Sequence, residues 1–175
     1  MRTLLALMLG VATIALSPAH AESPAERGRY LASFSGCDHC HTPGYFLGKP
    51  DATREFGGSD IGFKVGELGI FVGPNLTADK ETGLGGWTDE QIATVLTTGV
   101  RPDGRILAPI MPWRSFAKMT KPDVAALVAY LRTLPPISNM VPGPFGPDEK
   151  PPIFVMRLTP PEGKPPRAAA PPEQK

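Results

Sequence analysis

The sequence has little cysteine and little net charge. Only two of its 175 residues are cysteines, and 18 basic against 17 acidic side chains leave a formal net charge of +1. Two cysteines cannot build a disulfide-dense framework. A nearly neutral chain offers nucleic acid no basic stripe, and it has no polybasic segment to hold anionic lipid. These scarcities exclude a disulfide scaffold, a nucleic-acid binder and a protein held to membranes by its charge.

Long apolar runs are also scarce, because the chain has only one, Leu4 to Leu16. It follows the charged start Met1-Arg2-Thr3 and precedes Ala19-His20-Ala21, a small-x-small cleavage pattern. This layout is typical of a secretory signal peptide, and the run falls short of the roughly 20 residues that span a bilayer. We therefore expect residues 1–21 to be removed on export to the periplasm, leaving a mature chain that starts near Glu22. The alternative is an uncleaved anchor.

Glycine and proline, by contrast, are abundant. The chain holds 19 glycines and 22 prolines, and together they reach about twice their usual share. Both residues interrupt helices, so the composition excludes a long helical bundle or coiled coil. The length suits one domain of short elements joined by shaped loops, which makes a large enzyme a poor fit.

Three segments carry helix signals. Ser23-Pro24-Ala25-Glu26 combines an N-cap, a proline at the first helical position and a capping-box glutamate, and this helix should end at Ser35-Gly36. A second capping box at Thr88–Gln91 begins a helix that Gly99 should end. A third helix should run from Thr120 to Leu134, before Pro135-Pro136. The glycine-rich stretch 42–87 carries no helix signal, so something else must organise it.

The composition changes after the third helix. Residues 135–175 hold 13 of the 22 prolines, which excludes helix and central strand and favours extended polyproline II structure. We divide the mature chain into a domain at 22–136 and a proline-rich C-terminal extension at 137–175, which we expect to be partly disordered. Its apolar part, Val141 to Leu158, should lie across the surface of the domain.

The segment Cys37-Asp38-His39-Cys40-His41 carries the chemistry. It is a C-x-x-C-H motif, in which two thiols bind the vinyl groups of haem c and the adjacent histidine ligates the iron. A thioredoxin-like C-x-x-C would follow a strand, whereas a helix precedes this one. A zinc site needs four ligands, and outside the motif the only histidine is His20 in the signal peptide. A structural disulfide would not need His41. One motif predicts one covalent haem.

The second axial ligand must come from elsewhere in the chain. Methionine is a common choice, and the mature chain has Met111, Met119, Met140 and Met156. Met111 is favoured because Pro109 and Pro112 stiffen its loop. Met119, one residue before the last helix, remains the alternative.

This order of elements resembles a class I c-type cytochrome. The segments Cys37–Pro43, Gly73–Thr77, Glu81–Glu90, Gly99–Leu107 and Pro109–Trp113 are similar to those of bacterial periplasmic cytochromes that serve alcohol, aldehyde and sugar-acid dehydrogenases. The resemblance covers about residues 24–136.

The resemblance implies an all-α fold with three main short helices and long Gly/Pro-rich loops around one haem. It implies that Met111 is the sixth ligand. It also implies that the first helix crosses the last, with Gly28 against the face that carries Leu127, Tyr130 and Leu131. Three arginines are candidates to reach the haem propionates: Arg101, Arg105 and Arg114.

We therefore expect a periplasmic one-electron carrier rather than an enzyme, with His41 and Met111 as iron ligands. Its partners would be redox proteins, namely a dehydrogenase as donor and a cytochrome or terminal oxidase as acceptor. One alternative is a fixed cytochrome subunit of a dehydrogenase complex. Another is a haem-based gas sensor or peroxidase, which would require that Met111 not bind iron or that it leave the iron readily.

Overall fold

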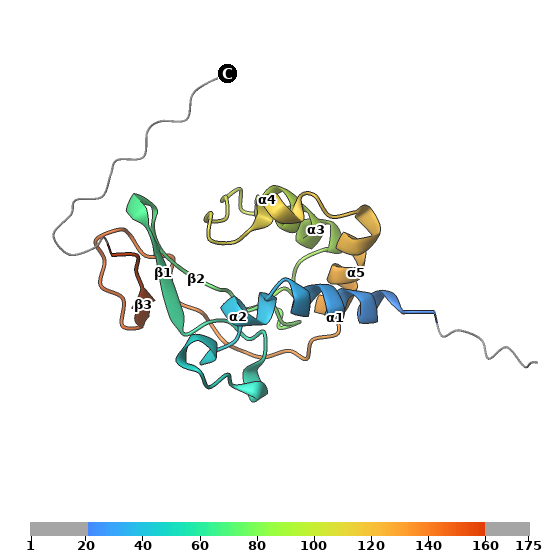
Figure 1. The fold of residues 1–175 in the computed structure, drawn as a ribbon, viewed down its shortest axis with the longest axis horizontal. Coiled ribbons are helices and arrows are strands. Elements are labelled where there is room, and N and C mark those ends of the chain that lie inside the picture. Colours follow the sequence, from blue (N-terminus) through green and yellow to red (C-terminus); the bar gives the residue numbers. More distant parts are fainter. Residues whose placement is uncertain (1–20, 160–175) are drawn as a thin grey trace, which may run out of the picture.

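The computed structural model describes residues 21–159, which form helices and a small sheet (Figure 1). A cavity lies between them. The predicted signal peptide at 1–20 and the end of the predicted extension at 160–175 lie outside the described residues. The helices of the described part are α1 (Pro24–Phe34), α2 (Cys37–His41), α3 (Asp89–Thr98), α4 (Trp113–Phe116) and α5 (Lys121–Leu131). The strands are β1 (Ile61–Val65), β2 (Gly69–Val72) and β3 (Phe154–Met156). Short 3-10 turns occupy Tyr45–Leu47, Ala52–Arg54 and Gly66–Leu68.

The three predicted helices are confirmed as α1, α3 and α5. Ser23 and Glu26 form the expected capping box of α1, and Thr88 and Gln91 form that of α3. Gly99 ends α3 with a left-handed backbone, φ +74°. The last helix stops at Leu131, three residues earlier than predicted, and the buried Leu134 follows it.

Helices α1 and α5 form the main helix–helix contact, as expected (Figure 1). A β-carbon placed on Gly28 would lie 1.9 Å from the carbonyl oxygen of Ala126 and 2.7 Å from Cβ of Tyr130. Only glycine allows this approach of the two backbones. The predicted contact with Tyr130 is therefore confirmed, but the closest neighbour of Gly28 is the backbone at Ala126.

The expected all-α fold is wrong. The glycine-rich stretch forms a hairpin in which β1 pairs antiparallel with β2, and β3 adds to β1 in parallel to give the order β2-β1-β3. Apolar Ile61, Phe63 and Val65 alternate with Gly62 and Lys64, the period of a half-buried strand, so β1 was readable from the sequence. The third strand was not, because its partner lies far away in the sequence.

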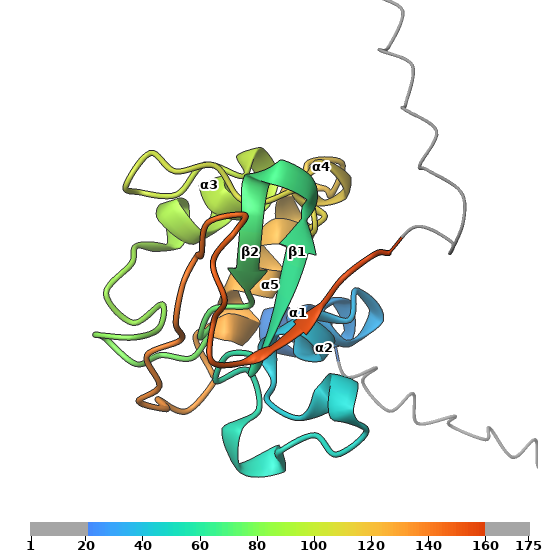
Figure 2. The same cartoon turned by 90° about the vertical axis from the view of Figure 1, so that its left-hand side faces the viewer.

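The C-terminal segment returns across the molecule beside the hairpin (Figure 2). Phe145 forms an isolated antiparallel bridge with Ile70 of β2, and Ile61 of β1 pairs with Phe154. β3 is an edge strand, which agrees with the exclusion of a central strand from this proline-rich segment.

No helix within residues 21–159 is long and apolar enough to cross a membrane.

Candidate functional site

A cavity of about 620 Å³ lies between the helices and the sheet. Ligand and cofactor pockets typically measure roughly 300–1,000 Å³. Five apolar side chains from three helices form one side, here called the helical wall: Ile92, Leu96, Phe116, Leu127 and Leu131. The hairpin and the C-terminal segment form the other side, here called the sheet wall: Phe63, Phe71, Val72 and residues 140–144. The cavity is large enough and apolar enough for an aromatic cofactor.

Cys37 and Cys40 reach this cavity from α2. Positions three apart share one face of a helix, which brings both thiols to the same wall. Both cysteines are free and partly buried. Burial, with the Asp38 carboxylate and Cys40 nearby, raises the pKa of Cys37 to about 11, and burial with Asp38 also raises the pKa of Cys40. At neutral pH both side chains are therefore thiols.

His41 also lines the cavity and is only 5% exposed. Its Nδ1 lies 2.7 Å from the carbonyl oxygen of Pro74. Burial lowers the pKa of His41, although the bond to Pro74 opposes this shift. A neutral imidazole that donates through Nδ1 keeps the lone pair of Nε2 for a metal.

The loop that carries Pro74 comes very close to α2. A β-carbon on Gly73 would lie 1.7 Å from the carbonyl oxygen of Cys40, so a side chain at this position would push the loop away. Glycine at 73 thereby allows the Pro74 carbonyl to reach His41.

Met111 lines the same cavity from the loop before α4. Two backbone bonds fold this loop tightly: Met111 N–H donates to Ala108 at 3.0 Å, and Trp113 N–H donates to the Met111 carbonyl at 2.8 Å. Met119 packs against the hydrophobic core and is not among the residues that line the cavity. Met140 lines the cavity but is 74% exposed, and Met156 lies in β3.

The three candidate arginines separate into two groups. Arg101 and Arg105 line the cavity, and the Arg101 guanidinium stands 5.0 Å from the ring centre of Trp87, another lining residue. Arg114 stacks on Trp113 at 4.4 Å and is not among the lining residues. Of the three candidates, Arg101 and Arg105 are therefore the ones placed to meet an anionic group in the cavity, and Arg101 also pairs with Asp103 at 3.3 Å.

The sheet wall was not predicted from the sequence. Phe63 has the alternation of β1 as its signal, but Met140–Pro144 carry no local signal that would bring them to the cavity. Their place follows from pairing with distant segments.

The donor set fits haem c better than a bare metal ion. Two thiols, one imidazole with a free Nε2 and one thioether surround a single apolar cavity. Within residues 21–159, no three His, Cys, Asp or Glu side chains gather as a metal site. Thiols spaced as C-x-x-C beside a histidine and a methionine are the groups that tether and ligate a haem.

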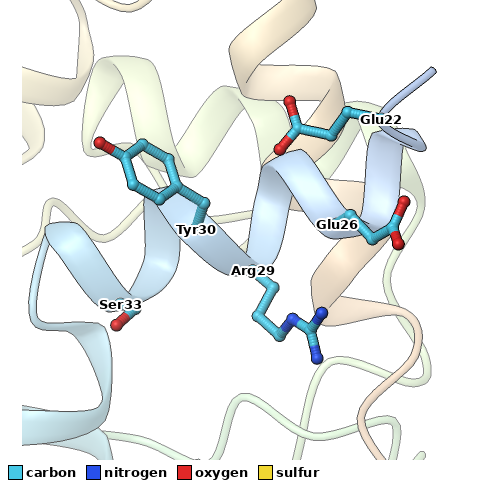
Figure 3. Close-up of a pocket in the computed structure, with 5 residues that line it drawn as sticks. All are labelled: Glu22, Glu26, Arg29, Tyr30 and Ser33. Carbon is cyan, nitrogen blue, oxygen red and sulfur yellow. The ribbon is translucent and has the colours of Figure 1, made fainter. Parts of the chain in front are cut away.

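A second depression lies on the outer surface of α1 (Figure 3). It is lined by five exposed residues, none of which lines the cavity: Glu22, Glu26, Arg29, Tyr30 and Ser33. The sticks in Figure 3 spread over the helix surface without converging on a common point. The candidate site is therefore the cavity.

Comparison with known proteins supplies the family. Residues 25–135 match the family model for cytochrome c. The chain is 34% identical over 130 residues to "Alcohol dehydrogenase (quinone), cytochrome c subunit" of Gluconobacter oxydans (strain 621H), covering 72% of this chain and 25% of that protein. It is 36% identical over 118 residues to "Fructose dehydrogenase cytochrome subunit" of Gluconobacter japonicus, covering 67% and 23%. It is 33% identical over 132 residues to "Gluconate 2-dehydrogenase cytochrome c subunit" of Pantoea cypripedii, covering 74% and 28%.

The chain thus spans about a quarter of the length of these relatives. The matched segment begins one residue inside α1, contains α2 to α5 and the C-x-x-C-H motif, and ends before the C-terminal segment of the sheet wall. The chain belongs to the cytochrome c family, whose members carry covalently attached haem c.

Proposed function

We propose that this protein is a periplasmic one-electron carrier with a single haem c, bound covalently by Cys37 and Cys40 and ligated by His41 and Met111. One observation carries the proposal. The two thiols of the motif, a buried imidazole with Nδ1 already bonded, and a methionine thioether all line one apolar cavity. The family match supports the electron-carrier role.

Haem c, when bound, supplies the iron that takes up and releases one electron. The chain's own residues tether it, orient it and control its surroundings. Cys37 and Cys40 would hold the haem through thioether bonds to its two vinyl groups. His41, oriented by the Pro74 carbonyl, offers Nε2, and Met111 offers its sulfur.

The apolar walls have an electronic effect. Side chains such as Leu127, 1% exposed, and Ile92, 1% exposed, keep water from one side of the cavity. A low-dielectric pocket disfavours the extra charge of ferric iron, and a methionine ligand acts in the same direction. Both features favour a raised reduction potential, which suits a protein that accepts electrons from a dehydrogenase.

The proposal includes export to the periplasm and the division of the chain into three parts. Residues 1–21 act as a signal peptide cleaved near Ala21, 22–136 form the cytochrome domain, and 137–175 form the extension. N-terminal sequencing of the protein recovered from the periplasm should start near Glu22. An intact Met1 in a membrane fraction would support the uncleaved anchor instead.

A fixed subunit of a dehydrogenase complex is the second candidate. Three relatives are named as cytochrome subunits of alcohol, fructose and gluconate dehydrogenases, which favours a dehydrogenase as electron donor here too. Co-purification with a dehydrogenase at high salt would support a fixed subunit. A free monomer that a dehydrogenase reduces in solution would support the independent carrier.

Absorption spectroscopy of the periplasmically matured protein tests the haem assignment. We expect a low-spin c-type spectrum with a methionine–iron charge-transfer band, unchanged by carbon monoxide. Met111→Leu should abolish that band, whereas the matched change Met119→Leu should keep it. High-spin haem that binds carbon monoxide at once would contradict the carrier and favour a gas sensor or peroxidase. Haem that is lost in acid acetone would contradict attachment through Cys37 and Cys40.

A further inference from the structure

The C-terminal segment at 137–145, here called the strap, is firmly attached to the cytochrome body. Ile137 accepts a hydrogen bond from Nδ2 of Asn75 at 2.6 Å and donates its N–H to Oγ1 of Thr77 at 3.1 Å. At the other end, the N–H and carbonyl of Phe145 exchange two 2.9 Å bonds with Ile70. Asn75, Thr77 and Ile70 are each at most 2% exposed, so these anchors are buried.

The middle of the strap is held as well. Asn139 donates its N–H to Oγ1 of Thr82 at 3.0 Å and its Nδ2 to the Gly57 carbonyl at 2.7 Å. The Val141 side chain packs directly on Gly58, where an added β-carbon would lie 2.2 Å from its Cγ2. A segment fixed at both ends and in its middle is part of the folded body.

The strap has the composition of a cavity wall. Residues 137–145 contain no charged side chain, and its two prolines stiffen the backbone. All five residues 140–144 line the same cavity as His41 and Met111. The strap lies outside residues 25–135, the segment that the family model covers.

The strap is also connected to the imidazole. Asn75 follows Pro74, whose carbonyl receives Nδ1 of His41. The Asn75 side chain binds both its own loop, through the N–H of Thr77 at 2.9 Å, and the strap, through Ile137. Asn75 therefore acts as a positioning residue between the strap and the bond that orients His41.

We propose that the strap is a working part of the haem site, which excludes water from its side of the cavity and holds the Pro74 carbonyl against His41. This inference rests on the proposed function. Burial and hydrogen bonds to the axial histidine are two of the means by which a protein tunes haem. Loss of the strap should therefore lower the reduction potential and make the iron easier for outside ligands to reach.

The test compares two truncations made in the whole exported protein. A stop after Lys150 removes β3 and leaves the strap, whereas a stop after Pro136 removes both. Two point variants accompany the truncations. Asn139→Ala deletes the hydrogen bond from the strap to the Gly57 carbonyl, and Asp148→Asn changes an exposed residue beyond the strap and serves as its control. The measurements are the reduction potential, the affinity of the ferric protein for imidazole, and hydrogen exchange of residues 72–82.

We expect the Pro136 truncation to bind imidazole about tenfold more tightly, the size of effect seen when a supporting hydrogen bond is lost at a metal site. Its potential should fall, and exchange at 72–82 should quicken. Asn139→Ala should change all three measurements in the same direction as the Pro136 truncation, but by a smaller amount. Asp148→Asn should match the full chain. The Lys150 truncation keeps every strap bond but loses the pairing of β3 with β1, so it should change all three measurements much less than the Pro136 truncation does.

Equal potentials, imidazole affinities and exchange rates in all these proteins would overturn the role of the strap and leave the carrier intact. If the Pro136 truncation does not mature, the difference between Asn139→Ala and Asp148→Asn decides. Absence of covalent haem from the full chain would instead overturn the proposed function.

Discussion

The helical wall and the sheet wall face the same cavity but are held in different ways. The helical wall is stabilised by side-chain burial, with Leu127 and Ile92 among the least exposed residues of the molecule. The sheet wall is stabilised by backbone bonds between distant segments, such as Ile70 with Phe145 and Ile61 with Phe154. The stability gained from apolar burial is spread over many side-chain contacts. The stability of a strand pair depends on a few backbone hydrogen bonds, which form only when the two strands are aligned in the correct register. We therefore expect mutations in the core of the helical wall to destabilise the whole protein. Mutations that disturb strand pairing should loosen the sheet wall locally.

The largest effect should come from the helical wall. Leu127→Ala removes a side chain that is 1% exposed from the core cluster, and the cavity left behind should cost about 3 kcal/mol of unfolding free energy. Urea unfolding of the holoprotein, followed by circular dichroism, measures this loss. The control Leu47→Ala truncates a leucine that is 51% exposed and should change little. Equal losses in both variants would contradict a helical wall that is held by burial.

The next effect should come from the crossing of α1 and α5. Gly28→Ala places a methyl group where the Ala126 carbonyl stands, and the helices must separate. Overpacking of this kind should lower the unfolding free energy by about 2 kcal/mol. Ser33→Ala, on the exposed surface of the same helix in Figure 3, serves as its control. A stable Gly28→Ala protein would show that the two helices can separate without cost.

A smaller effect is expected in the sheet wall. Ile70→Val deletes one methyl group from a fully buried residue of β2 and should cost about 1 kcal/mol. The two backbone hydrogen bonds between Ile70 and Phe145 remain in the variant, but the looser packing beneath them should quicken hydrogen exchange at 140–146 more than in α5. Uniform quickening over both regions would indicate that the two walls unfold together and would remove the contrast between them.

The smallest effect should come from the ion pair between α1 and α5. The hydrogen bond from Arg27, 2.9 Å away, and that from Thr120 lower the pKa of Asp123 below 3.8. The folded state therefore favours the carboxylate. The resulting stabilisation is complete above pH 4 or so and is lost as the pH falls through the lowered pKa.

Asp123→Asn should remove this dependence. The difference in unfolding free energy between the natural protein and the variant should be small at pH 7, as for exposed ion pairs generally, and should shrink further in acid. Thermal unfolding at pH 7, 5 and about 3 measures it. A difference that grows in acid would show that the pKa of Asp123 is raised instead.

The sequence predicted the features that are encoded locally. Ser23 with Glu26, and Thr88 with Gln91, sit three residues apart and specify helix starts without help from the rest of the chain. The C-x-x-C-H motif lies within five residues, and Met111 was selected by its neighbouring prolines. The structure places all four candidate ligands and tethers on one cavity.

Features that depend on distant partners were not predictable in the same way. Pro74 could not be identified as the partner of His41, because the two meet only after the glycine-rich stretch has folded back on α2. Phe154 pairs with β1 and Phe145 with β2, and nothing in the sequences of these two strands indicates those partners. The alternation of Ile61, Phe63 and Val65 indicates a strand, but the resemblance to class I c-type cytochromes implies an all-α fold that does not include it.

The hydrogen bonds of Asn75 restrict which amino acids position 75 can accept. Both hydrogens of its amide are used, on Thr82 and Ile137, and its oxygen receives the N–H and the hydroxyl of Thr77. Aspartate lacks the two donors, glutamine is one methylene too long, and an alanine would remove all four hydrogen bonds, including the one that satisfies the N–H of the fully buried Thr77. In a library of all twenty amino acids at this position, selected for mature haem protein, asparagine alone should survive.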